Sequence, residues 1–281
     1  MTGIIIKNIS NDYTINSNGK NYICKPRGKF RINNQTPLVG DIVIFDEKEN
    51  YIIDILPRKN ELIRPSIANI DLAVIVTSVK NPNFDSVLLD KQLTIISYNN
   101  IKPIIYLTKL DLLNKEELEK INVYIKYYQK IGYHVITNKE ELINQIKEKT
   151  VVLTGQSGAG KSTLLNKINP NLELKTNEIS YALGRGKHTT RHTEFFSTSN
   201  SYIADTPGFS KIDFLNMTAL DIRDNTKEMF DNLEKCKYQD CLHIKEDGCH
   251  VKELVKKGEI LKSRYENYVN FINNLPPKNK Y

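Results

Sequence analysis

Residues 155–163 read Gly155-Gln156-Ser157-Gly158-Ala159-Gly160-Lys161-Ser162-Thr163, which matches the pattern G-x-x-x-x-G-K-[ST] of a phosphate-binding loop (P-loop). The apolar run Val151–Thr154 precedes the loop and a helix-forming run follows it, as the motif requires. Its glycines let backbone N–H groups surround phosphates, while Lys161 reaches the β- and γ-phosphates and Ser162 ligates Mg²⁺. We predict that all nine residues bind a nucleotide and that Lys161 also takes part in catalysis.

Apolar strands alternate with amphipathic helices around the P-loop. From about residue 66 we expect strands at Leu72–Thr77, Ile104–Leu107, His134–Thr137 and Val151–Thr154. The intervening helices are expected at Phe84–Tyr98, Lys115–Lys130 and Glu140–Lys147. This alternation is typical of a parallel sheet covered by helices, so the sequence predicts an α/β domain over residues 66–217.

The segment Thr108-Lys109-Leu110-Asp111 indicates which purine base the chain binds. It follows the expected strand Ile104–Leu107 and resembles the [NT]-K-x-D motif of GTPases. In such proteins the aspartate accepts hydrogen bonds from N1 and N2 of guanine, which adenine does not offer, and the lysine stem lies along the base. Thr108, Lys109 and Asp111 are therefore predicted to bind the base of GTP or GDP.

A third motif, Asp205-Thr206-Pro207-Gly208, has the form D-x-x-G and follows an expected strand at Tyr202–Ala204. Asp205 is predicted to hold Mg²⁺ through water, and the N–H of Gly208 to contact the γ-phosphate. Common GTPases place the P-loop first and the base-reading motif last, whereas here the base-reading motif comes first. This order indicates a circularly permuted P-loop GTPase domain, a rearrangement that is tolerated because domain termini often lie close together.

The segment between the P-loop and D-x-x-G contains GRGKHTTR, residues 184–191, in the position of a switch loop. Either Thr189 or Thr190 should complete the magnesium shell, and Thr190 is the preferred ligand and catalytic residue. Many GTPases have a water-orienting glutamine directly after D-x-x-G, but Phe209 occupies that position here. His188 is the candidate catalytic substitute; the alternative is an exposed loop histidine without a catalytic role.

The segment before the α/β domain, residues 1–65, is predicted to form an OB-fold β-barrel. Its β-rich stretches GIIIKN, KNYICK, GDIVIFD and NYIIDIL are separated by Asn, Gly and Pro turn signals. Residues 25–31, KPRGKFR, place basic side chains around one aromatic ring, a composition that suits phosphate contact and base stacking. The predicted RNA-binding residues are Lys25, Arg27, Lys29, Phe30 and Arg31, although the segment also fits a solvated hairpin loop.

After about Asn216 the expected strands stop, and residues 218–281 are predicted to form a helical zinc-binding domain. Its helices are expected at Asp221–Leu233, Val251–Lys256 and Glu259–Asn273. Between the first two helices the sequence offers three thiolates and one imidazole, the set of a closed structural zinc site. The predicted ligands are Cys236, Cys241, His243 and Cys249, with His250 as a competing ligand that we expect to point elsewhere.

The composition is that of a soluble globular chain. It has 281 residues, of which 40% are hydrophobic and 26% charged, and a formal net charge of +7. The positive charge is compatible with an acidic partner such as nucleic acid but does not identify one. The apolar runs are far too short to span a bilayer, so no membrane contact is predicted.

Taken together, these segments resemble the ribosome small subunit-dependent GTPase A family, the circularly permuted ribosome-assembly GTPases of bacteria. The resemblance rests on the motif order, the stretches GRGKHTTRH, DTPGF and RPSIANID, and the Cys/His spacing, and it covers nearly the whole chain. It implies an OB-fold, a permuted GTPase domain and a zinc domain that act in late maturation of the small (30S) ribosomal subunit. One segment departs from the family, because only Thr137-Asn138-Lys139 follows the strand His134–Thr137 where a guanine-contacting segment belongs. Asn138 is included among the nucleotide-binding residues with its role left open.

The leading functional prediction is a GTPase that binds the small subunit and its rRNA and hydrolyses GTP to GDP and phosphate, with stimulation by the subunit. One alternative is a GTP-dependent regulatory switch that recruits a protein partner without RNA. A second is an ATPase whose zinc module binds nucleic acid, which Asp111 argues against. We further expect a cytoplasmic monomer that uses GTP or GDP, Mg²⁺ and one structural Zn²⁺.

Overall fold

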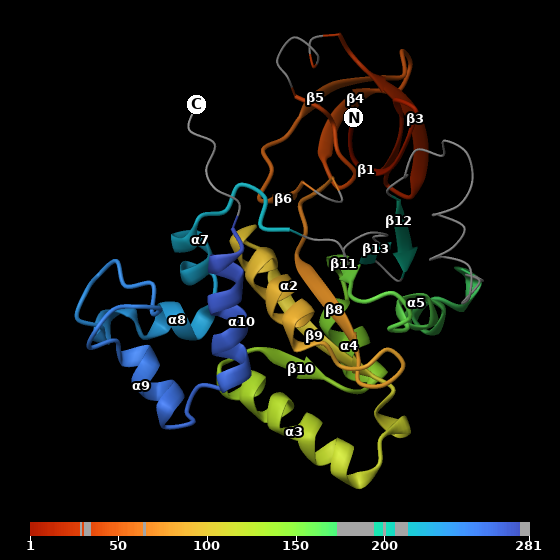
Figure 1. Ribbon diagram of the computed structural model, residues 1–281. Helices are drawn as coiled ribbons and strands as arrows, with labels where there is room; N and C mark the ends of the chain where they lie inside the picture. Colours follow the sequence, from red (N-terminus) through yellow and green to blue (C-terminus); the bar gives the residue numbers. More distant parts are fainter. Residues whose placement is uncertain are drawn as a thin grey trace.

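Along the chain a closed β-barrel, a six-stranded sheet and a group of helices follow one another (Figure 1). The computed structural model describes residues 1–28, 30, 35–63, 66–172, 194–198, 201–205 and 213–275. Among these residues no helix is both long and apolar enough to cross a membrane.

The barrel consists of five strands in the order β1-β2-β3-β5-β4 and closes on itself. Alternate side chains point inward and are fully buried, as period-2 strands with one apolar face require; they include Ile5, Ile15, Phe45 and Ile52. The predicted OB-fold is confirmed. Sequence analysis did not name strand β2, because four of the six residues in its sequence DYTINS are polar. The strands are β1 (Thr2–Ile9), β2 (Asp12–Ser17), β3 (Lys20–Pro26), β4 (Ile42–Asp46) and β5 (Tyr51–Ile55).

The sheet of the α/β domain has the order β10-β9-β8-β11-β13-β12. Its central strand β8 is buried at every position, so it reads as a continuous apolar run. We expected a parallel sheet, and the edge strand β12 departs from this, because it pairs antiparallel with β13. The strands are β8 (Leu72–Ser78), β9 (Lys102–Thr108), β10 (His134–Ile136), β11 (Thr150–Thr154), β12 (Phe195–Thr198) and β13 (Ser201–Asp205).

Helices cover both faces of this sheet (Figure 1). On one face, α4 (Lys139–Ile146) and α5 (Lys161–Ile168) bury their apolar residues against strands β8, β9 and β11. On the other face lie α2 (Ser86–Tyr98) and α3 (Lys115–Lys130), together with the C-terminal helices. This layered arrangement brings the carboxyl ends of the parallel strands to one edge, where ligands bind in such sheets.

Within residues 213–275 the structure has four α-helices rather than the three predicted. The expected helix Asp221–Leu233 is interrupted after Asp224, because the Asn225 side chain and the Thr226 hydroxyl donate to carbonyls four residues earlier and end the first segment. The helices are α7 (Ala219–Asp224), α8 (Lys227–Asp231), α9 (His250–Lys256) and α10 (Lys262–Asn273), with a 3₁₀ turn η4 (Leu233–Lys235).

Smaller elements connect these parts. Strands β6 (Glu61–Leu62) and β7 (Ile67–Ala68) form a two-stranded sheet between the barrel and β8, and 3₁₀ turns lie at η1 (Leu110–Leu112) and η2 (Pro170–Leu172). The barrel also contacts the edge of the main sheet, where Lys7 pairs with Glu194 through a β-bridge and a 2.8 Å ion pair.

Candidate functional site

The P-loop leaves the end of β11 in a conformation that only glycine permits at its first residue. Gly155 has φ +134°, and a Cβ there would lie 2.0 Å from the carbonyl oxygen of Val76 in β8. At the other end Gly160 adopts φ +99° and caps α5, which begins at Lys161. The loop therefore packs against β8 and presents the amino end of a helix, which attracts phosphate.

The lysine of the P-loop lies over the loop itself. Lys161 Nζ donates to the carbonyl oxygens of Gly155 and Gln156 at 2.9 and 2.7 Å. The next two residues, Ser162 and Thr163, occupy the first turn of α5 and are at least partly accessible. All nine predicted phosphate-binding residues thus fall in one continuous loop and helix start.

The base-reading segment touches the P-loop directly, although about fifty residues separate them in the chain. The Thr108 hydroxyl donates to the Ala159 carbonyl oxygen at 2.7 Å. Lys109, whose backbone is left-handed with φ 65°, donates from Nζ to the Gly158 carbonyl oxygen at 2.9 Å and also to the Asn81 carbonyl oxygen. Asp111 follows in η1 with an exposed side chain, next to this junction.

Asn138 caps a helix, as its position directly before α4 explains. It precedes α4, and its side-chain oxygen accepts a 2.7 Å hydrogen bond from the Glu141 N–H, an N-cap. It follows β10, which lies beside β9, so it stands at the same sheet edge as Thr108. The capping bond engages the side-chain oxygen and leaves the amide N–H groups as the atoms available to a ligand.

The remaining predicted magnesium and catalytic residues are described in part. Strand β13 ends at Asp205, which pairs with Leu153 in β11, so this position lies at the same edge as the P-loop. The Asp205 side chain lies outside the described part of the structure, as do His188, Thr189, Thr190, Gly208 and Phe209.

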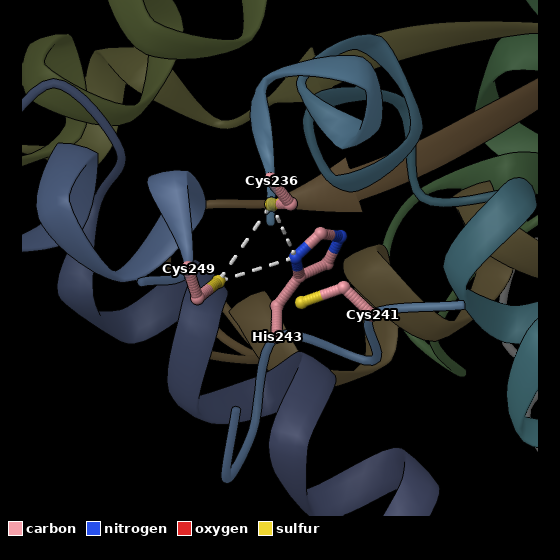
Figure 2. A group of neighbouring side chains, drawn as sticks. All are labelled: Cys236, Cys241, His243 and Cys249. Carbon is pink, nitrogen blue, oxygen red and sulfur yellow. Dashed lines mark hydrogen bonds between the residues drawn. The ribbon is translucent and has the colours of Figure 1, made fainter. Parts of the chain in front are cut away.

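The structure gathers the four predicted zinc ligands, Cys236, Cys241, His243 and Cys249, so that their ligand atoms all lie within 4.8 Å of one another. His243 Nδ1 is 3.5 Å from Cys236 Sγ and 3.3 Å from Cys249 Sγ, and the two sulfurs are 4.0 Å apart (Figure 2). Tetrahedral zinc with Zn–S bonds of about 2.3 Å requires sulfurs about 3.8 Å apart, so the donor set fits this ion.

The surroundings orient the imidazole and keep the site closed. His243 Nε2 donates to the Met229 carbonyl oxygen at 3.1 Å, which directs Nδ1 toward the sulfurs. Burial lowers the pKa of His243 to about 4, so the imidazole is neutral, and burial raises the pKa of the Cys241 thiol to about 12. A bound cation would favour the thiolates instead. His250 lies outside the cluster and has its Nδ1 4.0 Å from a Glu253 oxygen.

The predicted RNA-binding segment is described only in part. Lys25 and Arg27 are exposed at the end of β3, while Lys29 and Arg31 lie outside the described residues. Phe30 is 3% exposed and belongs to the hydrophobic core, so its ring cannot stack on a base in this structure. The prediction for Phe30 is wrong, because the apolar barrel interior competes for an aromatic side chain.

Sequence reasoning missed Gln92, which supports the P-loop from α2. Its buried Nε2 donates to the buried Thr154 hydroxyl at 2.9 Å, one residue before the loop. The sequence offered no clear signal for this role, because Gln92 lies among other polar residues, Asp90, Lys91 and Thr94.

Comparison with known proteins places the barrel and the nucleotide-binding motifs in one family. A family model described as RsgA GTPase matches residues 55–215, and one described as RsgA N-terminal domain matches residues 2–52. A protein of Enterococcus faecalis named small ribosomal subunit biogenesis GTPase RsgA is 46% identical over 280 residues, covering 97% of this chain and 94% of that protein. A relative named RsgA 2 from Oceanobacillus iheyensis is 46% identical over 283 residues, covering 97% of both chains.

Solved structures agree over the full length. A crystal structure of YloQ, described as a circularly permuted GTPase, has a TM-score of 0.81 and 38% identity, covering 100% of this chain and 96% of that one. A crystal structure of YjeQ from Thermotoga maritima has a TM-score of 0.83 and 34% identity, with 98% of each chain covered. The permuted motif order, the barrel and the match over nearly every residue have one explanation: this chain belongs to the RsgA GTPase family.

Proposed function

We propose that this chain is a GTPase that binds the small (30S) ribosomal subunit and assists its late maturation, hydrolysing GTP to GDP and phosphate. The observation that carries the nucleotide part is the contact of Thr108 and Lys109 with P-loop carbonyls at the carboxyl edge of the sheet. The relatives' printed name, small ribosomal subunit biogenesis GTPase, supports the ribosomal part.

Each part of the nucleotide, from the base to the γ-phosphate, has proposed partners in the chain. Asp111 would accept hydrogen bonds from guanine, beside Thr108 and Lys109, with an amide N–H of Asn138 available to the same ligand. The P-loop would hold the phosphates, with Lys161 stabilising the charge that develops during transfer. Magnesium would neutralise phosphate charge when bound, with Ser162, Thr190 and Asp205 as its protein partners; Gly208 would contact the γ-phosphate.

Hydrolysis needs a group that positions water, and Phe209 offers no hydrogen bond. We assign this task to His188. Because positioning and electrostatics supply nearly all of the catalysis in phosphoryl transfer, the isolated protein should turn over slowly. Docking on the subunit would then raise the rate by completing the site.

The zinc set Cys236, Cys241, His243 and Cys249 fits a structural ion with no open position, so we propose that it orders the C-terminal helices. We propose the domain division 1–65, 66–217 and 218–281, with the barrel and zinc domain docking on rRNA. Exposed Lys25 and Arg27 would contribute phosphate contacts. The protein would act as a cytoplasmic monomer.

The experiment measures GTP hydrolysis by the full chain with and without purified small ribosomal subunits. We expect stimulation of about tenfold or more and, in His188→Ala, loss of most of it with GTP binding retained. His134→Ala, whose imidazole lies 2.8 Å from Glu141 away from the P-loop, is the matched control and should keep the stimulation.

Subunit binding separates this proposal from a regulatory switch that recruits a protein without RNA. With a non-hydrolysable GTP analogue the chain should bind subunits more tightly than with GDP, and binding should weaken steeply with added salt. Full activity without subunits, undiminished stimulation in His188→Ala, or absence of subunit binding would contradict the proposal.

A further inference from the structure

Helix α2 carries three buried polar side chains, Asp90, Gln92 and Thr94. Residues two positions apart lie about 200° from each other around a helix, so Gln92 faces the opposite way from Asp90 and Thr94. Buried polar groups are costly unless they are hydrogen-bonded, so the partners of these side chains indicate what the helix connects.

On one side α2 is bound to the start of the P-loop. Gln92 Nε2 donates to the Thr154 hydroxyl at 2.9 Å, and neither residue is exposed to solvent. Thr154 ends β11 and is followed by Gly155, which is pressed against the Val76 carbonyl. A shift of α2 therefore acts on the residue that sets where the loop begins.

On its other side α2 is bound to the C-terminal helices by a buried cluster of charges. Arg264 of α10 lies 2.6 Å from Asp90 Oδ1 through one terminal guanidinium nitrogen, and its Nε donates to Glu228 Oε1 of α8 at 2.8 Å. The three side chains Asp90, Glu228 and Arg264 are each less than 5% exposed. Such a cluster holds only in a narrow geometry, because each charge has left water.

Neighbouring hydroxyl and amide groups complete the cluster. Tyr128 of α3 donates to Asp90 Oδ1 at 2.5 Å, and Asn267 of α10 donates to Asp90 Oδ2 at 2.7 Å. Tyr127 donates to Glu228 Oε1 at 2.7 Å. The carboxylates of α2 and α8 are thus fixed from two helices, α3 and α10, and α2 cannot move relative to α10 without breaking several of these bonds.

We propose that α2 couples the C-terminal helices to the nucleotide site, with Gln92 as a positioning residue for the P-loop and the Asp90–Arg264–Glu228 cluster setting the place of the helix. Nucleotide affinity then depends on residues of α8 and α10 that touch no part of the P-loop. The inference concerns nucleotide binding alone and holds whether or not the chain acts on the ribosomal subunit.

The test measures the Kd for GDP with Mg²⁺, by calorimetry on the full chain, in two sets of variants. Gln92→Leu and Thr154→Val should each weaken binding about fivefold, the worth of one buried hydrogen bond, and the double variant should lose no more than either single one. The second set neutralises the cluster with Asp90→Asn, Glu228→Gln and Arg264→Met together. This triple variant should weaken GDP binding in the unmodified background and have no further effect in the Gln92→Leu background.

A control distinguishes coupling from general loss of stability. Tyr268→Phe removes a 2.8 Å bond from α10 to the Leu242 carbonyl on the zinc side, so it should lower Tm and leave the GDP affinity unchanged. If the triple variant does not fold, Arg264→Lys, which keeps the charge but loses the two-sided contact, is measured in its place. The proposal would be overturned if altering the cluster left the GDP affinity unchanged, or if the cluster variant and Gln92→Leu weakened GDP binding independently so that their effects multiplied. It would also be overturned if Tyr268→Phe weakened GDP binding as much as the cluster variant does.

Discussion

Replacing Gly155 by alanine tests whether contact with β8 places the P-loop. The added Cβ would lie 2.0 Å from the Val76 carbonyl oxygen, whereas real Cβ contacts are not shorter than 3.0 Å, so the two must separate by a further 1 Å. Such a displacement breaks contacts between the loop and phosphate, and a lost hydrogen bond to a charged group costs about 1.5–3 kcal/mol, or roughly 10- to 150-fold in Kd. We therefore expect the Kd for GDP to rise by a factor of this size, roughly 10- to 150-fold, in Gly155→Ala.

The assay is calorimetric titration of GDP with Mg²⁺, with Tm measured in parallel. Gly19→Ala is the matched control, because Gly19 also has a left-handed backbone, φ +79°, but no atom lies within 4 Å of its Cβ position. It should lose about 1–2 kcal/mol of stability from backbone strain and keep its GDP affinity. A Kd within twofold of the unmodified value in a folded Gly155→Ala protein would refute the reasoning.

Two further predictions concern the base and the metal. Asp111→Asn should weaken GTP binding and favour xanthosine triphosphate, whose base carries a carbonyl at position 2; competition binding with both nucleotides measures this, and equal affinity of the unmodified protein for ATP and GTP would contradict the assignment. One zinc per chain should copurify, and Cys241→Ser should lose it and lower Tm because the buried thiol is one of the four proposed ligands. Elemental analysis and a thermal melt measure this, and purified protein without zinc would contradict it.

The parts of the site that lie on strand ends could be predicted from sequence. The P-loop follows one expected strand and Thr108-Lys109-Leu110-Asp111 follows another, and parallel strands bring their carboxyl ends to one edge. The contacts of Thr108 and Lys109 with Ala159 and Gly158 bear out that reasoning about position. The Cys/His cluster was predictable for a similar reason, because its four residues lie within fourteen positions and need only local folding.

Features that depend on competition between environments were predicted less well. Phe30 was assigned to RNA because its neighbours are basic, but the barrel interior buries it. The helix expected from Asp221 to Leu233 is broken, because the side chains of Asn225 and Thr226 bond to the backbone of the preceding turn. Strand β12 went unpredicted because two of its four residues, Ser197 and Thr198, are polar, so it does not stand out as an apolar run.

Short runs of residues are enough to indicate the chemistry that we propose: the phosphate-binding loop, the guanine-reading motif, their permuted order and the zinc ligands. How these parts are joined becomes visible only once the chain has folded. Gln92 meets Thr154 across 62 positions and Asn267 meets Asp90 across 177, and helical periodicity gives no partner for a buried polar residue. Such contacts are fixed when distant elements pack together, because burial of a charge is tolerated only where the fold supplies its counterpart.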